Sequence, residues 1–406
     1  MAEPLVAVIM PSLNVKKYLK TCMDSVVGQT LRGLEILCVD AGSTDGTLEL
    51  LEDYARSDER VRVIKSDVRS YGRQVNLGMD LARAKYVAVV ETDDYLDPHM
   101  YERLYAAAEE NQLDFIKADF LGFRVLRNGA QVYDEGRIWE EAEGKYGRVL
   151  SAAEAPELWV RDVNIWKGLY NREFLTRKGI RLNETPGAAF QDIGFCHLLL
   201  HSAKRGMYIR DMLYFYRRGR AGASSSTPRG LLFARQEYKR MLETPVPEET
   251  EERFFHFLYV RMAYVFIGEY EKALESGRGA DGEYREAASW FRAVLGEAVR
   301  RGRLSQEDVE EEVWQKLRRL SDGEEAYAAW WRRDREKREA AKRRLLEEMA
   351  AGGIIIFGCG KDGERCLLFC DEHQVEVAGF CDNNAKLWGK RYYGYEVCAP
   401  GELIQK

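Results

Sequence analysis

Three acidic side chains stand directly after a short apolar run in the N-terminal part of the chain. Residues 87–90 are Val-Ala-Val-Val, and Glu91, Asp93 and Asp94 follow them. Four apolar residues bounded by charge predict a buried strand, and open α/β sheets bind their ligands at the carboxyl ends of such strands. Oxygen ligands at this spacing suit Mg²⁺ or Mn²⁺, which often bridges to substrate phosphates. On these residues alone, a solvated turn that caps the next helix is an equal alternative.

Two earlier apolar runs, residues 5–10 and 34–39, also end in polar residues. The side chains after them could contact a nucleotide: Pro11, Ser12 and Asn14 after the first run, and Asp40, Gly42 and Ser43 after the second. The carboxyl ends of neighbouring parallel strands lie side by side, so these residues and the acidic group at 91–94 are expected to meet in one crevice. Gly42 would permit the sharp turn that a loop on a base or ribose needs.

The elements that must position these residues follow from the spacing of the apolar side chains. Helical spacing predicts helices near residues 16–30, 47–57 and 72–84, and a further short strand is expected at 61–64. Strand and helix therefore alternate up to the acidic group. This alternation predicts an α/β fold with a mostly parallel sheet and helices on both faces.

Four segments, in this order, carry a family resemblance: VAVIMPSLN, LCVDAGSTDGT, YGRQVNLGMDLARAKYV and VVETDDYL. They resemble family 2 glycosyltransferases of the GT-A fold, most closely the bacterial members that build surface polysaccharide or lipopolysaccharide, and the resemblance covers about residues 4–220. It implies Mn²⁺ or Mg²⁺ on Asp93 and Asp94. It also implies that a nucleotide, most often uridine, is bound by residues of these segments: Pro11, Ser12, Asn14, Asp40, Gly42, Ser43, Arg73, Asn76, Glu91 and Asp93.

The sequence departs from the family pattern at two positions. The usual Asp-Asp-Gly-Ser has Ala41 in second place, and the acidic motif opens with Glu91 instead of Asp. Cation binding is still expected, because Asp93 and Asp94 are intact. The departures keep open another interpretation, a non-catalytic nucleotide-sugar-binding scaffold of a polysaccharide assembly complex. A nucleotidyl- or sugar-phosphate transferase of the same fold would need a Gly- and Lys-rich loop after the first strand, which residues 14–17 match poorly.

Asp192 lies where the pattern passes from loop to helix. Residues 183–187, Asn-Glu-Thr-Pro-Gly, must form a loop, and an apolar helical face begins at Phe195. Spacing alone favours an N-cap role for Asp192. The segment also resembles the Glu-Asp motif of the family, with Gln191 in place of Glu, and the resemblance makes Asp192 the catalytic base. A single base acting on an acceptor hydroxyl implies inversion at the anomeric carbon. The resemblance thus implies transfer from a UDP-sugar to a glycan or lipid-linked acceptor.

The acceptor is expected to bind within residues 101–228. Trp166 could stack on a sugar ring, although a Trp is more often a core residue, and Lys167 and Gln191 complete the expected acceptor set. His197 and His201 could contact a metal or phosphate, but unpaired histidines are more often packed or solvated.

A basic pair precedes a loop rich in Gly and Ser. Arg217 and Arg218 end a predicted strand, and residues 219–226 follow. The loop resembles the flexible closing segment of the family, in which basic residues approach the diphosphate. Arg217 is therefore expected at the nucleotide, and a solvated sheet edge is the alternative for both arginines.

Changes in pattern divide the chain into three predicted domains. Residues 1–228 should form the GT-A domain, with a nucleotide-sugar half at 1–100 and an acceptor half at 101–228. Residues 229–350 show helical spacing without strands and predict a helical domain. Residues 351–406 should form a small Rossmann-like module.

The C-terminal module carries a glycine motif. Residues 354–357 predict a strand, GxGxxG follows at 358–363, and a second strand at 375–380 precedes Asp382. This order matches the dinucleotide fingerprint better than a lone GxGxxG does. The module resembles one appended to some bacterial sugar-modifying enzymes. We expect an accessory or homo-oligomerisation module, with nucleotide binding as an open alternative.

Composition limits the classes of partner. The formal net charge is −6 over 406 residues, so nucleic-acid binding is not expected. No apolar segment reaches the roughly 20 residues of a membrane span, and the N-terminus lacks the basic region of a signal peptide. A cytoplasmic protein is therefore expected. Basic residues between 332 and 348 suggest peripheral contact with the inner membrane face. The acidic residues interleaved with them argue against such contact. Five of the eight cysteines lie after residue 358 and are expected to be reduced and packed, with zinc binding as the weaker alternative. The other three are expected in the core.

Overall fold

The chain divides into two compact units in the computed structural model, which describes residues 3–220, 227–350 and 353–404. The first unit comprises Met1–Leu121 and Glu135–Tyr327, and the second comprises Gly122–Asp134 and Ala328–Lys406. Domain boundaries at residues 228 and 350 remain predictions.

The first unit is built on a sheet with the strand order β3-β2-β1-β4-β8-β6-β9-β5. The first four of these strands are parallel: β1 (Val6–Ser12), β2 (Leu34–Asp40), β3 (Val61–Lys65) and β4 (Tyr86–Val89). The sheet continues with β8 (Gly168–Asn171), β6 (Phe115–Val125), β9 (Gly206–Arg217) and β5 (Tyr95–Leu96), and β7 (Gln131–Gly136) pairs with β6. β8 is antiparallel to β4 and β6. The predicted α/β fold is confirmed, with the parallel strands all within residues 6–89.

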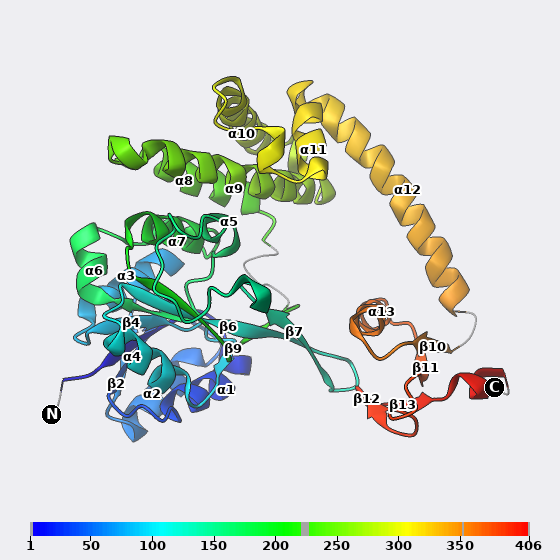
Figure 1. The fold of residues 1–406 in the computed structure, drawn as a ribbon, viewed down its shortest axis with the longest axis horizontal. Coiled ribbons are helices and arrows are strands. Elements are labelled where there is room, and N and C mark those ends of the chain that lie inside the picture. Colours follow the sequence, from blue (N-terminus) through cyan, green and yellow to red (C-terminus); the bar gives the residue numbers. More distant parts are fainter. Residues whose placement is uncertain (1–2, 221–226, 351–352, 405–406) are drawn as a thin grey trace. The chain divides into compact units, whose positions relative to one another are not determined.

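Helices cover both faces of the parallel strands (Figure 1): α1 (Lys16–Val27), α2 (Thr47–Ser57), α3 (Tyr71–Leu81) and α4 (Met100–Glu110). Every residue of β1 and β2 is buried, as expected for strands covered on two faces. α3 approaches β1 closely at Gly78, where an added Cβ would lie 2.4 Å from Cγ2 of Ile9. This close approach fixes α3 beside the carboxyl ends of the strands.

A buried ion pair joins β6 to the segment after α5 (Leu158–Arg161). Nζ of Lys117 lies 2.7 Å from Oδ2 of Asp162, and both side chains are 0% exposed. The Tyr208 hydroxyl donates to the same oxygen at 2.5 Å. Burial lowers the pKa of Lys117, but the charge and hydrogen bond of Asp162, together with Cys196 and Tyr170, outweigh burial and hold that pKa above its ordinary value. Lys117 is therefore charged inside the protein.

We expect Asp162→Ala to lower the free energy of unfolding by about 3–5 kcal/mol, because it leaves the Lys117 charge buried without its partner. Denaturant titration measures the loss. Glu348→Ala, which breaks the exposed Arg344–Glu348 pair, is the control and should cost about 1 kcal/mol or less. A loss of about 1 kcal/mol or less for Asp162→Ala, as for an exposed pair, would contradict the expectation.

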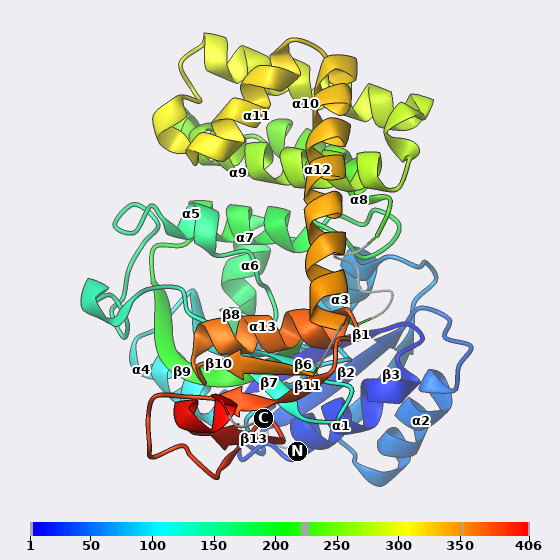
Figure 2. The ribbon, with the colours of Figure 1, turned by 90° about the vertical axis from the view of Figure 1, so that its right-hand side faces the viewer.

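The first unit continues as a layer of helices (Figure 2): α8 (Gly230–Leu242), α9 (Glu248–Glu275), α10 (Gly282–Arg300) and α11 (Glu311–Ser321). This confirms the helical pattern expected beyond residue 229. The layer packs on α7 (Gln191–Ser202), which follows α6 (Arg172–Lys178). Nε2 of His197 lies 3.1 Å from the carbonyl oxygen of Phe254 in α9. Of the helices in the described ranges, none is long and apolar enough to cross a membrane.

The second unit contains a small parallel sheet in the order β10-β11-β13, with β12 antiparallel to β13. Its elements after α12 (Glu324–Ala350) are β10 (Ile354–Phe357), α13 (Lys361–Glu372), β11 (Val377–Cys381), β12 (Arg391–Tyr392) and β13 (Tyr395–Cys398). The predicted strand, glycine turn, helix and strand are therefore present.

Residues 122–134, the connection between β6 and β7, complete the core of the second unit. Buried apolar side chains of this hairpin and of the C-terminal segment form one cluster: Leu126, Val132, Ile356, Leu367, Val377, Phe380 and Val397. The backbone N–H of Arg127 donates to Asp371 at 3.0 Å, and the Asn128 amide donates to the carbonyl of Tyr393 at 3.1 Å. The C-terminal module is thus not built from residues 351–406 alone.

Candidate functional site

Two adjoining pockets open at the carboxyl ends of β1 and β4. The strand-end pocket has a volume of about 430 Å³ and is lined by Pro11 and Ser12. The Asp192 pocket has a volume of about 390 Å³ and is lined by Asp192 and Trp166. Both pockets share one wall, which consists of Tyr71, Glu91, Asp93, Ala188 and Arg220. Molecules bound in the two pockets would meet at this shared wall.

Glu91 lies in the shared wall and accepts a hydrogen bond from the Tyr71 hydroxyl at 2.5 Å. Burial raises the pKa of Glu91 to about 8; the Tyr71 hydrogen bond opposes this shift, and the charges of Asp93 and Asp192 add to it. Glu91 is therefore largely neutral at pH 7 in the protein alone. The contact between Tyr71 and Glu91 could not be predicted from the sequence, because a tyrosine at the start of a predicted helix does not indicate a polar partner.

The two predicted metal ligands point in different directions. Oδ2 of Asp93 lies 2.9 Å from Nε of Arg220, and its side chain is 19% exposed. Asp94 is buried: Oδ1 accepts the backbone N–H of Arg217 at 2.7 Å, and Oδ2 accepts the Tyr214 hydroxyl at 2.8 Å. Asp93 thus lies where its carboxylate faces both pockets. Asp94 instead links β9 to residues 91–94 through its two hydrogen bonds.

The surroundings of Asp93 fit a divalent cation that takes most of its ligands from a substrate. The described part of the chain holds no group of three or more His, Cys, Asp or Glu side chains able to bind a metal by itself. The Asp93 carboxylate already carries a positively charged partner, the guanidinium of Arg220. Mg²⁺ and Mn²⁺ suit oxygen ligands, and Mg²⁺ commonly binds one or two carboxylates plus phosphates and water. Asp93 could hold such a cation once a diphosphate is present.

Gln74 of α3, which the sequence analysis did not single out, lines the strand-end pocket beside Pro11 and Ser12. Its amide donates to the carbonyl of Ser12 at 3.0 Å and to that of Val39 at 2.6 Å. Gln74 therefore holds the carboxyl ends of β1 and β2 together at the pocket. Helical spacing alone did not reveal that this polar side chain is buried.

The polar residues after β2 build a turn. Asp40 is 1% exposed and accepts the backbone N–H groups of Gly42 at 2.9 Å and Ser43 at 3.0 Å. Asn14, with a left-handed φ of 52°, donates its backbone N–H to the Ser43 hydroxyl at 2.9 Å. Gly42 also has a left-handed φ, of 83°, as a sharp turn requires. The structure thus brings these residues together as a scaffold beside the pocket, and their contact with a nucleotide stays a prediction.

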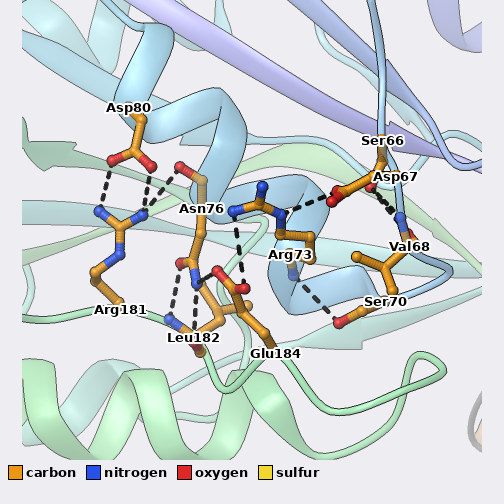
Figure 3. A network of polar contacts seen from close by, with 10 residues as sticks. All are labelled: Ser66, Asp67, Val68, Ser70, Arg73, Asn76, Asp80, Arg181, Leu182 and Glu184. Carbon is orange, nitrogen blue, oxygen red and sulfur yellow. Dashed lines mark hydrogen bonds and ion pairs between the residues drawn. The ribbon is translucent and has the colours of Figure 1, made fainter.

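Figure 3 shows Arg73 and Asn76 linking α3 to the segment before Asp192. The Asn76 amide donates to the Leu182 carbonyl and to Glu184, each at 2.9 Å, and its Oδ1 accepts the N–H of Leu182 at 3.1 Å. Arg73 forms an ion pair with Glu184 at 3.8 Å. Neither residue lines the two pockets. Their predicted nucleotide contact stays a prediction, and in this structure they position the loop that leads to Asp192.

Asp192 lies in the first turn of α7. Phe190, with a left-handed φ of 70°, occupies the N-cap position, so Asp192 is not the cap. Burial raises the pKa of Asp192 to about 6, against the hydrogen bond that its Oδ1 accepts from the Ile193 N–H at 2.9 Å. A carboxylate with this pKa is charged at pH 7 and is a better proton acceptor than an exposed one. The geometry suits a general base.

Trp166 and Gln191 line the same pocket as Asp192. Trp166 stacks on Tyr216 with ring centroids 5.0 Å apart and an interplanar angle of 4°. Gln191 is 2% exposed, and its amide donates to the Thr185 hydroxyl at 3.1 Å. Trp166 and Tyr216 thus form an aromatic wall, and Gln191 holds the loop that precedes α7.

Lys167 and the two histidines lie away from the pockets. The Lys167 side chain is 3% exposed and lies 3.8 Å from Asp162, so it belongs to the buried charges. Burial lowers the pKa of His197 to about 3 and also lowers the pKa of His201. Both rings pack in T-shaped contacts with Phe254. The structure therefore gives these side chains packing roles, and an acceptor contact by Lys167 stays a prediction.

Three arginines line the Asp192 pocket: Arg217, Arg218 and Arg220. Nε of Arg217 donates to the backbone carbonyl of Asp93 at 2.9 Å. The guanidinium groups of Arg217 and Arg220 lie 4.6 and 5.9 Å from the Tyr18 ring. The end of the predicted strand points to Arg217 and Arg218 but not to Arg220, although Arg220 follows them closely in the sequence. Most of the predicted closing loop, at 221–226, lies outside the described residues.

In the second unit, the predicted GxGxxG motif forms the turn between β10 and α13. Gly358 has a φ of 95°, and a Cβ at Gly363 would meet its carbonyl oxygen at 1.9 Å. Asp382 accepts the backbone N–H groups of Cys359 and Asn384, each at 2.7 Å. Gly358 and Gly363 are therefore needed by the turn itself, whereas Gly360 is not constrained in this way. Nucleotide binding and homo-oligomerisation through this module stay predictions.

The parallel strands, the acidic residues after β4 and the buried carboxylate of Asp192 in an adjoining pocket fit a fold of the GT-A type. Residues 7–151 match the family model described as Glycosyl transferase family 2. The similarity to this family is carried by that stretch of the chain.

Three curated relatives share this part of the chain. The uncharacterized glycosyltransferase EpsJ of Bacillus subtilis is 31% identical over 53% of this chain and 61% of its own length. Glycosyltransferase GlyG of Streptococcus pneumoniae is 29% identical over 57% and 76%, and the uncharacterized glycosyltransferase YibD of Escherichia coli is 30% identical over 52% and 60%. The chain thus spans less than two thirds of EpsJ and of YibD.

A solved structure shares the fold. The crystal structure of S. aureus TarS in complex with UDP-GlcNAc aligns with a TM-score of 0.57 and 19% identity, over 80% of this chain and 88% of that one. At this identity the likeness shows the fold alone.

Proposed function

We propose that this chain transfers a sugar from a UDP-sugar to a hydroxyl group of a glycan or lipid-linked acceptor in surface polysaccharide synthesis, with inversion at the anomeric carbon. The observation that carries the proposal is the wall shared by the two pockets. A donor in the strand-end pocket and an acceptor in the Asp192 pocket would meet at that wall. The glycosyltransferase relatives and the fold shared with TarS, solved with UDP-GlcNAc, support this class of donor.

Asp192 acts as the general base in this proposal. It accepts the proton of the acceptor hydroxyl as that oxygen attacks the anomeric carbon from the Asp192 pocket, and the nucleoside diphosphate departs on the opposite side, toward the strand-end pocket. This direct displacement forms one bond to the anomeric carbon and breaks another, so it inverts the configuration. The aromatic wall of Trp166 and Tyr216 offers a flat apolar face on which an acceptor sugar can rest.

Asp93, whose carboxylate lies in the shared wall, would hold Mn²⁺ or Mg²⁺. A bound cation of this kind neutralises the charge that develops on the leaving group. Arg220 lies in the shared wall, paired to Asp93, and its guanidinium is placed where it could bind a diphosphate. Asp94 accepts the backbone N–H of Arg217 and so fixes the position of Arg217, the first of the three arginines that line the Asp192 pocket.

Calorimetric titration with UDP, GDP, CDP and dTDP, each with and without Mn²⁺, tests the donor class. We expect UDP with Mn²⁺ to bind at least about tenfold more tightly than the other three, because the strand-end pocket is proposed to hold uridine. Tight binding of another nucleotide would correct the base while keeping the class. Binding of none of the four would contradict the proposal.

A further inference from the structure

The helical layer of the first unit contains a separate cavity, which we call the α10–α11 cavity. Its volume is about 510 Å³, within the range of small-molecule sites, and it shares no residue with the two pockets already described. Buried Phe266, Leu295 and Leu320 line it, together with Val299, which is 39% exposed, and Trp314. The cavity is therefore a mostly apolar chamber between helices.

A glycine opens one wall of the α10–α11 cavity. Gly296 lies inside the helix Gly282–Arg300, where glycine is less favourable than alanine. A Cβ added at this position would have only Nη1 of Arg300 within 4 Å, at 3.7 Å. Neither a left-handed φ nor a close neighbour requires glycine here. The missing side chain leaves room in the cavity.

The charged residues around the α10–α11 cavity are all basic: Arg292, Arg300 and Arg318 line it, and no Asp or Glu does. Arg292 pairs with Glu324 at 3.0 Å, and Arg300 pairs with Glu297 at 2.6 Å. The Arg318 side chain forms no ion pair within the described ranges. An apolar chamber with an unpaired guanidinium complements a molecule that has a hydrocarbon part and an anionic part.

We propose that the α10–α11 cavity binds a single-chain lipid with an anionic head group. The hydrocarbon chain fills the space beside Gly296, and a phosphate or carboxylate binds the guanidinium of Arg318. A sugar or a nucleotide would leave most of its polar groups unpaired, because Gln306 and Ser321 are the uncharged polar side chains of the lining. This site goes beyond the proposed transfer reaction and does not depend on it.

Calorimetric titration of the full chain with decyl phosphate, kept below its micelle concentration, tests the site. We expect saturable binding of one molecule per chain, no binding of inorganic phosphate, and binding of neutral decyl maltoside that is at least about tenfold weaker. Gly296→Leu should abolish binding by filling the chamber. Arg318→Gln should weaken it by about tenfold or more, and Arg319→Gln, at a neighbouring residue outside the lining, should leave it unchanged.

Thermal unfolding provides the control for folding, since Gly296→Leu removes a glycine from a helix interior and should melt at or above the temperature of the unaltered chain. Wild-type affinity in Gly296→Leu would overturn the proposed site, and wild-type affinity in Arg318→Gln would overturn the proposed contact of the head group. The remaining alternative is that a second copy of the chain covers the cavity, and light scattering tests it. If the unaltered chain is a dimer and Gly296→Leu is a monomer, the second copy occupies the cavity and the proposal is overturned.

Discussion

Replacing Asp192 with Asn is expected to lower the rate of sugar transfer by about 10²- to 10⁴-fold, the usual contribution of a positioned general base. Asn keeps the size of the side chain and an oxygen that can accept the N–H of Ile193, but it cannot take a proton from the acceptor. Binding of the nucleotide should be unchanged, because Asp192 lines only the second of the two pockets. Release of the nucleoside diphosphate measures the rate, and calorimetry measures binding.

The pH dependence sharpens this prediction. Burial raises the pKa of Asp192 to about 6, so below that pH the carboxyl group is protonated and cannot act as a base. The kcat/KM of the unaltered enzyme should therefore rise through about pH 6, and the rise should be absent in Asp192→Asn. Glu173→Gln, which alters an exposed carboxylate of α6 outside both pockets, is the matched control and should keep both the rate and the rise. Full residual transfer in Asp192→Asn would remove Asp192 from its role.

The place of the site could be predicted from the sequence, but the direction of its carboxylates could not. The ends of β1, β2 and β4 meet because adjacent parallel strands run in register, and an apolar run that stops on polar residues shows this directly. The roles of Asp93 and Asp94 depend on distant partners. Oxygens of Asp94 are taken by Tyr214 and Arg217, 120 and 123 residues away. Two adjacent aspartates look alike until such partners are known.

Long-range packing also explains what the sequence analysis missed in the second unit. Leu126 and Val132 have the alternation of an ordinary hairpin, which shows that they are apolar but not which core they enter. They pack with side chains of the C-terminal segment, and the hydrogen bond from Arg127 to Asp371 joins residues 244 apart in the chain. The local spacing of apolar residues indicates whether a segment is a helix or a strand. It does not indicate which other segment the helix or strand packs against, because that depends on tertiary contacts between residues far apart in the sequence.

Replacing Asp93 with Asn is expected to abolish the Mn²⁺ dependence of UDP binding, whereas Asp94→Asn should keep it. Asp93 presents its carboxylate to both pockets, and its loss removes the charge that would hold the cation. Both carboxylate oxygens of Asp94 accept hydrogen bonds from the protein. Asp94→Asn should therefore lower the free energy of unfolding by about 1 kcal/mol, because one of these hydrogen bonds is weakened. Calorimetry with UDP, at several Mn²⁺ concentrations, compares the two variants.

The same experiment separates loss of the cation from damage to the nucleotide pocket. In the unaltered protein the guanidinium of Arg220 is paired to Asp93, and Asp93→Asn removes the charge that holds it. Arg220 is then available to the diphosphate, so without Mn²⁺ this variant should bind UDP no more weakly than the unaltered protein does. Weaker binding without Mn²⁺ would mean that Asp93 supports the pocket itself. If Asp94→Asn also lost the Mn²⁺ response, Asp94 would be a cation ligand despite its hydrogen bonds. The backbone at Arg217, which donates to Asp94, would then have to move when the cation binds.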